Sequence, residues 1–127
     1  MLLNDLFIVD DCTTGNGTLK ATLHLRVPHR IFDGHFPGRP VLPGACLVQL
    51  VNELAATIAG GEILLIRAGQ IKFITMIDPG RDGSIRIGIT GIQQPTGEWQ
   101  VTAEAINAGA VCFRFKGIFR GAGDYAA

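Results

Sequence analysis

A histidine in a loop rich in glycine and proline is the side chain of this sequence best suited to acid–base chemistry. His35 lies between Gly34 and residues 36–38, Phe-Pro-Gly. An imidazole with a pKa of about 6.5 can accept a proton near neutral pH and return it. Because ordered loops of this kind often carry function, we expect His35 to act as a base. His24 and His29 lack these surroundings, and we interpret both as structural.

A second group that could do chemistry is the backbone at the start of a helix predicted over residues 44–59. This segment has no proline, is rich in leucine and alanine, and is followed by Gly60 and Gly61. Pro43 and Gly44 occupy its first turn. The N–H groups of a helix start are unpaired and carry about half a positive charge. Gly44 has no side chain to block a ligand, so we expect its N–H to hold an oxygen atom that gains negative charge.

Polar side chains of the predicted helix fall in one stripe. Gln49, Glu53 and Thr57 follow one another at steps of four, and Asn52 lies three residues after Gln49. These spacings place the four side chains on one helix face. The helix is otherwise apolar nearly all round, so we expect it to be buried.

The remaining chain shows the patterns of β-strands. Apolar and polar side chains alternate in residues 18–27, which indicates a half-buried strand. After the helix, further strands joined by short turns are predicted over residues 62–68, 70–77, 84–93, 98–107 and 110–120. Such connections favour an antiparallel sheet. We therefore predict a single α+β domain over residues 1–127, with an antiparallel sheet wrapped around one long central helix and a core over about residues 18–120.

Composition excludes several classes of partner. The 11 basic and 11 acidic residues give zero formal charge, which argues against nucleic acid or an anionic membrane. No apolar stretch approaches the ~20 residues that span a bilayer, and the N-terminus lacks the basic region of a signal peptide. The 3 cysteines form no CxxC pair, so we interpret them as reduced thiols of a cytoplasmic protein. No metal-ligand spacing and no phosphate-binding glycine loop occurs, so neither a metal nor a cofactor is expected.

Residues 34–44, GHFPGRPVLPG, resemble the signature loop of the bacterial 3-hydroxyacyl-acyl-carrier-protein dehydratases, which runs into the central helix in that family. Residues 68–80, AGQIKFITMIDPG, are similar to a strand and turn of the same family. The resemblance extends over roughly residues 18–120. It implies the hotdog fold and an enzyme that needs no cofactor.

The resemblance also implies a reaction. A 3-hydroxyacyl thioester, carried by acyl carrier protein or coenzyme A, would lose water in fatty-acid, polyketide or aryl-polyene synthesis. His35 would remove the proton next to the carbonyl, and the N–H of Gly44 would hold the carbonyl oxygen. Family members form dimers whose active site lies at the interface, so a homodimer, or a trimer of such dimers, is implied. Contacts with the acyl chain are expected from Phe32, Phe36, Pro43 and Phe73.

One position departs from the family's pattern. Dehydratases of this family carry a glutamate or aspartate at the helix position that is Gln49 here, and Glu53 stands where relatives often have glutamine. A glutamine can hydrogen-bond a hydroxyl group but cannot release a proton at neutral pH. Glu53 lies ~6 Å further along the helix axis, so it does not replace the missing carboxylate by simple geometry.

Several interpretations of this exchange stay open. His35 carries the proton in both directions while Gln49 orients the hydroxyl group, or Glu53 reaches the site through a water molecule or a shifted helix. Alternatively, the site binds acyl chains without turning them over, or Glu53 is a structural carboxylate paired with an arginine or with its own helix. Beside a dehydratase, the alternatives are therefore a non-catalytic acyl-thioester-binding subunit and a hotdog thioesterase.

Overall fold

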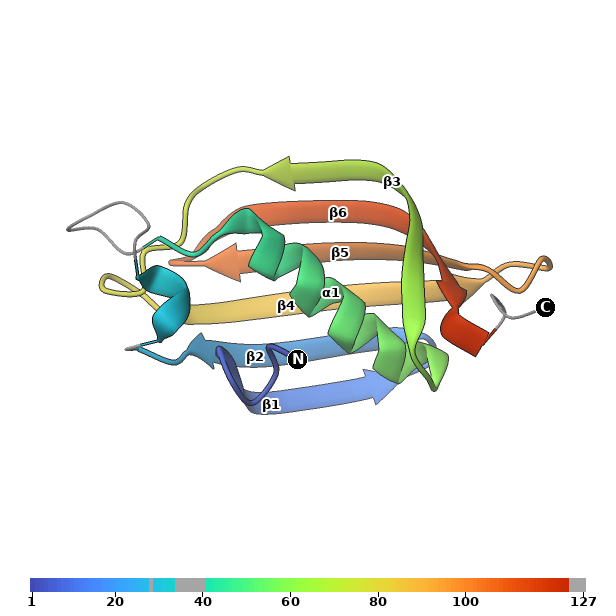
Figure 1. Ribbon diagram of the computed structural model, residues 1–127, viewed down its shortest axis with the longest axis horizontal. Helices are drawn as coiled ribbons and strands as arrows, with labels where there is room; N and C mark the ends of the chain where they lie inside the picture. The colour runs from blue at the N-terminus through green and yellow to red at the C-terminus, as the bar shows by residue number, and fades with distance from the viewer. Residues whose placement is uncertain (28, 34–40, 124–127) are drawn as a thin grey trace.

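An antiparallel sheet and an α-helix dominate the structure. The computed structural model of the chain describes residues 1–27, 29–33 and 41–123. Within these ranges six strands form one sheet in the order β1-β2-β4-β5-β6-β3, and every pair of neighbours is antiparallel. Helix α1 (Gly44–Ala59) lies across one face of this sheet (Figure 1). The predicted α+β class is confirmed.

The strands lie on both sides of the helix in the sequence. Two precede α1 and four follow it: β1 (Phe7–Gly15), β2 (Thr18–Leu25), β3 (Ile63–Phe73), β4 (Ser84–Gln93), β5 (Trp99–Asn107) and β6 (Ala110–Gly121). A short 3-10 helix, η1 (Arg30–Phe32), lies between β2 and α1. The strands predicted over residues 18–27, 84–93, 98–107 and 110–120 are therefore confirmed to within a few residues.

Alternation of side chains decides which face of the sheet meets the helix. Leu19, Ala21 and Leu23 of β2 are buried and pair directly with Ile89, Ile87 and Ile85 of β4, which are buried as well. Successive side chains of a strand point to opposite faces, so these rows share the inner face that packs against α1. The residues between them, such as Lys20 and Arg86, are exposed on the outer face.

Strand β1 was not predicted from the sequence. The predicted core began near residue 18. The sequence of β1, FIVDDCTTG, lacks apolar–polar alternation, and most of its residues are exposed. β1 forms because a tight turn after Gly15 brings β2 back alongside it, and the two strands pair antiparallel. Asn16 and Gly17 in this turn have φ angles of 53° and 76°, which suit an Asn-Gly hairpin. The core consequently begins at Leu6 and Phe7, both fully buried.

Strand β3 corrects a second expectation. Two strands were expected from the pattern over residues 62–68 and 70–77, but residues 63–73 form one strand. Its pairing with β6 is irregular between Leu65 and Arg67 and again between Ala68 and Gln70. Such bulges let a strand continue past a local disturbance in its register. β3 is an edge strand, because β6 is its only neighbour in the described sheet.

Helix α1 has the predicted boundaries, and its buried side anchors it to the sheet. It ends at Gly60, whose φ of 79° is the left-handed conformation typical of a C-cap. Of the polar stripe predicted on this helix, Gln49 and Thr57 are exposed and Asn52 and Glu53 are partly buried, and Ala45 on the same side is exposed as well. No helix within the described ranges is long and apolar enough to cross a bilayer. The buried side consists of Cys46, Leu47, Leu50, Val51, Leu54 and Ala55.

Candidate active site at the start of the helix

An apolar cavity of 590 Å³ lies where helix α1 begins. Its walls come from two chain segments, residues 41–47 before and within the helix and residues 73–77, which begin at the last residue of β3. A hydrogen bond from the Leu42 N–H to the Ile77 carbonyl (3.0 Å) joins the two segments. Pro43 and Phe73, from which acyl contacts are expected, both line this cavity.

The first turn of α1 leaves backbone donors available at the cavity wall. Pro43 is the N-cap residue and offers no side-chain hydrogen bond, while the Cys46 N–H already donates to the Pro43 carbonyl (3.0 Å). No described residue accepts a hydrogen bond from the N–H of Gly44 or Ala45. Helix starts with unpaired amides attract oxygen atoms that carry negative charge. The geometry therefore allows Gly44 to bind a polarised carbonyl oxygen.

The Phe73 ring lies so close to Gly44 that a side chain at position 44 would have to displace it. A Cβ atom built on Gly44 would lie 2.7 Å from both Cε1 and Cζ of the Phe73 ring. Phe73 is itself stacked on Phe113, with ring centroids 5.4 Å apart. Phe73 is nevertheless 53% exposed, so much of its surface faces solvent. Its ring consequently stands between solvent and the start of the helix.

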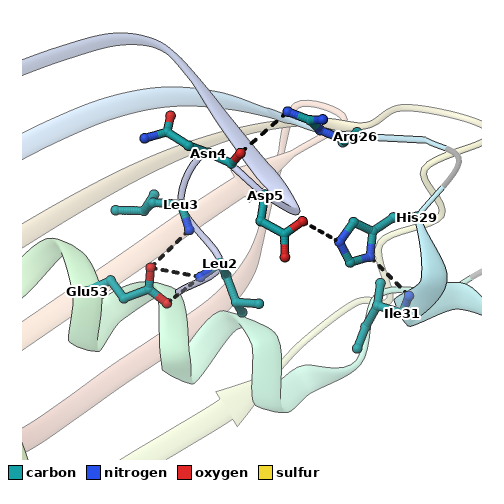
Figure 2. Close-up of polar contacts among 8 residues, drawn as sticks. All are labelled: Leu2, Leu3, Asn4, Asp5, Arg26, His29, Ile31 and Glu53. Atoms are coloured by element: carbon teal, nitrogen blue, oxygen red, sulfur yellow. Dashed lines mark hydrogen bonds and ion pairs between the residues drawn. The ribbon is translucent and has the colours of Figure 1, made fainter.

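Gln49 and Glu53 form a hydrogen-bonded pair on the open side of α1. Gln49 Nε2 donates to Glu53 Oε2 over 3.0 Å. Glu53 also accepts hydrogen bonds from the backbone N–H groups of Leu2 (3.0 Å to Oε1 and 2.9 Å to Oε2) and Leu3 (2.9 Å to Oε1), as Figure 2 shows. Neither Gln49 nor Glu53 lines the cavity of this chain.

The chain segment that reaches Glu53 also reaches the loop before the helix. Asp5 accepts a hydrogen bond from Nε2 of the buried His29 (3.0 Å), and His29 Nδ1 accepts one from the Ile31 N–H (3.0 Å) (Figure 2). Both ring nitrogens of His29 are therefore occupied, which fits the structural role predicted for it. The hydrogen bond from His29 holds the pKa of Asp5 below its ordinary value of 3.8.

Other predicted residues lie away from this cavity or outside the described ranges. His35 and Phe36 belong to residues 34–40, which are outside the described part. Phe32 lies in η1, is partly buried, and packs against the hydrophobic core without lining the cavity. Burial raises the pKa of the Cys46 thiol above 9.0, so this cysteine stays protonated and packs as a small core residue.

Sequence reasoning did not anticipate the contacts of residues 2–5. Leu2 and Glu53 are 51 positions apart in the chain, and Asp5 and His29 are 24 positions apart. No periodic pattern marks such a contact, because its donors include backbone N–H groups that every non-proline residue carries.

A family model for ApeI-like proteins, described as ApeI dehydratase, matches residues 11–112 of this chain. Among curated proteins, the 3-hydroxyacyl-[acyl-carrier-protein] dehydratase FabZ of Rickettsia felis is 29% identical over 96 residues, covering 69% of this chain and 65% of that protein. FabZ of Rickettsia massiliae is 27% identical over 109 residues, covering 80% and 74% respectively. The chain thus spans less than two thirds of the length of the first of these relatives.

Solved structures share the architecture at low sequence identity. The dehydratase heterocomplex ApeI:P from Xenorhabdus doucetiae aligns with a TM-score of 0.75 at 19% identity, covering 89% of this chain and 96% of that one. The PaaI protein of the phenylacetic acid degradation operon of E. coli aligns with a TM-score of 0.65 at 16% identity, covering 87% and 78%. The hotdog fold implied by the loop resemblance is confirmed.

The contact between Gly44 and Phe73 predicts a coupled pair of substitutions. Gly44→Ala should lower the free energy of unfolding by about 1–2 kcal/mol, because the new methyl group displaces the stacked ring. In a Phe73→Ala background the same change should cost much less, since the ring is gone and alanine favours a helix. Urea denaturation of the four proteins measures the coupling.

Gly61→Ala is the matched control for this cycle, because a Cβ atom at Gly61 meets nothing within 4 Å. Its effect should not depend on Phe73. An equal cost of Gly44→Ala with and without the ring would show that Phe73 does not enforce the glycine.

Proposed function

This chain belongs to the family of ApeI-like dehydratases, and on that premise we propose that it removes water from 3-hydroxyacyl thioesters carried by acyl carrier protein or coenzyme A. The observation that supports this proposal most is the start of α1. Two backbone N–H groups there lack an acceptor among the described residues, beside an apolar cavity of 590 Å³. An acyl chain needs the apolar walls, and a thioester carbonyl needs the donors.

The proposed reaction gives roles to His35, Gly44 and Gln49. His35 takes the proton from the carbon next to the carbonyl, while the Gly44 N–H stabilises the negative charge that develops on the carbonyl oxygen. The bond between the third carbon and its hydroxyl oxygen then breaks. The hydroxyl group leaves as water with the proton that His35 returns, and Gln49 orients it through a hydrogen bond. The products are a 2-enoyl thioester and water.

The proposed site requires a second copy of the chain. Gln49 lies on the exposed side of α1 and does not line the cavity, so a loop from another chain has room to meet it. Edge strand β3 and the segment after it also expose six large apolar side chains, which a soluble monomer rarely leaves uncovered. We therefore include a homodimer that pairs along β3 in the proposal. The six side chains are Leu64, Leu65, Ile71, Phe73, Ile74 and Met76.

A non-catalytic acyl-thioester-binding subunit is the second candidate function. It is favoured by one specific observation, the amide of Gln49 at the helix position where the family carries an acid. Loss of a general acid costs about 10²–10⁴ in rate. A dehydratase in the set of similar structures is a heterocomplex, so a subunit of this kind could pair with a different hotdog chain.

The direct test mixes the purified chain with a 3-hydroxyacyl thioester and follows enoyl absorbance. We expect slow formation of the enoyl product, and we expect His35→Ala to reduce it at least about 10²-fold because the base is removed. His24→Ala is the matched control and should leave the rate unchanged, since His24 pairs with Asp10 on the exposed face of β2. Release of free thiol would indicate a thioesterase instead. Binding without either product would favour the non-catalytic subunit.

A charge exchange on α1 tests whether the missing carboxylate limits the rate. Gln49→Glu alone would set two negative charges side by side, because Gln49 Nε2 lies 3.0 Å from Glu53 Oε2. In Gln49→Glu/Glu53→Gln, the new amide at position 53 can donate to the new carboxylate and still accept from Leu2 and Leu3. We expect this double variant to form enoyl product about 10²-fold faster than the native chain.

The single substitution Gln49→Glu should gain less than the double variant, and Glu53→Gln alone should gain nothing. Stopped assays at several substrate concentrations separate a change in kcat from a change in KM. A double variant no faster than the native chain would mean that the carboxylate is not the missing element.

A further inference from the structure

Both oxygens of the Glu53 carboxylate accept hydrogen bonds from described residues. Oε1 accepts from the N–H groups of Leu2 and Leu3, and Oε2 accepts from Leu2 and from Gln49 Nε2, at distances of 2.9–3.0 Å. An ionised carboxylate offers about four lone-pair sites. Three N–H donors point at these sites, with the single Leu2 N–H shared between both oxygens, so Glu53 would have to break part of this network before it could serve as an acid or base.

This occupancy fixes the orientation of the Gln49 amide. A carboxylate can only accept, so the Gln49 atom that faces Glu53 must be the nitrogen. The amide is planar, and its oxygen therefore points away from Glu53. No described residue donates to Gln49 Oε1, and the Gln49 side chain is exposed. The open side of the helix thus carries an oriented hydrogen-bond acceptor.

Glu53 is itself held by contacts that are independent of Gln49. Leu2 and Leu3 belong to a compact turn in which the Leu2 carbonyl accepts from the N–H groups of Asp5 (3.2 Å), Leu6 (2.9 Å) and Phe7 (3.0 Å). Leu6 and Phe7 are fully buried and anchor this turn in the core. The position of the carboxylate is consequently set by the fold, and the amide of Gln49 follows it.

We propose that Glu53 is a positioning residue, which orients Gln49 so that its side-chain oxygen accepts a hydrogen bond from the 3-hydroxyl group of the substrate. This inference rests on the proposed function and deepens it, because it names the group that selects hydroxylated acyl chains. A hydroxyl group donates to Gln49 Oε1, whereas a saturated acyl chain has no donor at that carbon. The pair therefore discriminates 3-hydroxyacyl thioesters from saturated ones of equal length.

The test measures two affinities by calorimetry in a His35→Ala background, where the substrate is not consumed. The ligands are a 3-hydroxyacyl pantetheine thioester and the saturated acyl pantetheine thioester of equal chain length. With Gln49 and Glu53 intact, we expect the hydroxylated ligand to bind about tenfold more tightly, the contribution of one hydrogen bond. Glu53→Ala should reduce this preference to about one, with little change in the affinity for the saturated ligand.

Gln49→Leu should abolish the preference as well, and combining it with Glu53→Ala should have no further effect, because Glu53 acts through Gln49. Glu53→Gln serves as a control for unfolding of the N-terminal turn. Its new amide oxygen can still accept hydrogen bonds from the N–H groups of Leu2 and Leu3. It should nonetheless remove the preference, because the new amide nitrogen then faces Gln49 and turns the Gln49 oxygen toward position 53. Glu104→Ala, which removes a carboxylate paired with Arg114 (3.1 Å) on the outer face, is the matched control and should preserve the preference.

Two failures are distinguishable. If the His35→Ala protein binds neither thioester, the proposed function is wrong and this inference falls with it. If it binds both, and the Glu53 variants keep the preference for the hydroxylated ligand, the proposed function stands and Glu53 has no positioning role.

Discussion

Packing of the apolar side of α1 against the inner face of the sheet is the constraint on which the rest of the structure depends. Leu50, Val51 and Leu54 leave at most 3% of their surface exposed, and they belong to one hydrophobic core with the buried rows of β2 and β4. Burial on this scale stabilises a helix by roughly 1.5–3 kcal/mol for each large side chain. Because this side is fixed, the first turn of the helix and its polar stripe are held at defined positions, where they can act on a ligand.

Much of this arrangement was predictable from local pattern. Helix α1 was predicted at its observed limits because an apolar run without proline lies between Pro43 and Gly60. Both residues end a helix through their own backbone conformation, so no distant contact is needed. The alternation in β2 and β4 fixed their inner faces for the same reason. β1 was not predictable, because its pairing with β2 stabilises a segment that has no strand pattern of its own.

The candidate site was predictable only in part. Any helix start presents unpaired N–H groups, so Gly44 could be proposed as a carbonyl-binding residue from its position alone. Two contacts join distant parts of the chain: the ring of Phe73 lies over Gly44, and the N–H groups of Leu2 and Leu3 donate to Glu53. The residue types at these positions do not predict either contact. The pairing of Gln49 with Glu53 was visible as a four-residue spacing, but the sequence does not show that Leu2 and Leu3 also donate to the carboxylate.

The hydrogen bond between Gln49 and Glu53 does not depend on which of the two positions carries the carboxylate. A carboxylate and an amide four residues apart can bond in either order, since one always accepts and the other donates. The order in this chain gives the accepting carboxylate to the N-terminal turn and leaves the amide on the open side of the helix. The turn, the helix and the loop that begins at η1 are thereby linked through residues 2–5.

The most direct measurement is the amide proton shift of Gly44 in a ¹⁵N-labelled His35→Ala protein titrated with an acyl pantetheine thioester. We expect the Gly44 signal to move downfield as its N–H donates to the thioester carbonyl, while the signal of Gly61 at the far end of α1 stays in place. A thioester that binds and leaves the Gly44 signal unchanged would contradict the assignment of the helix start as the carbonyl-binding group.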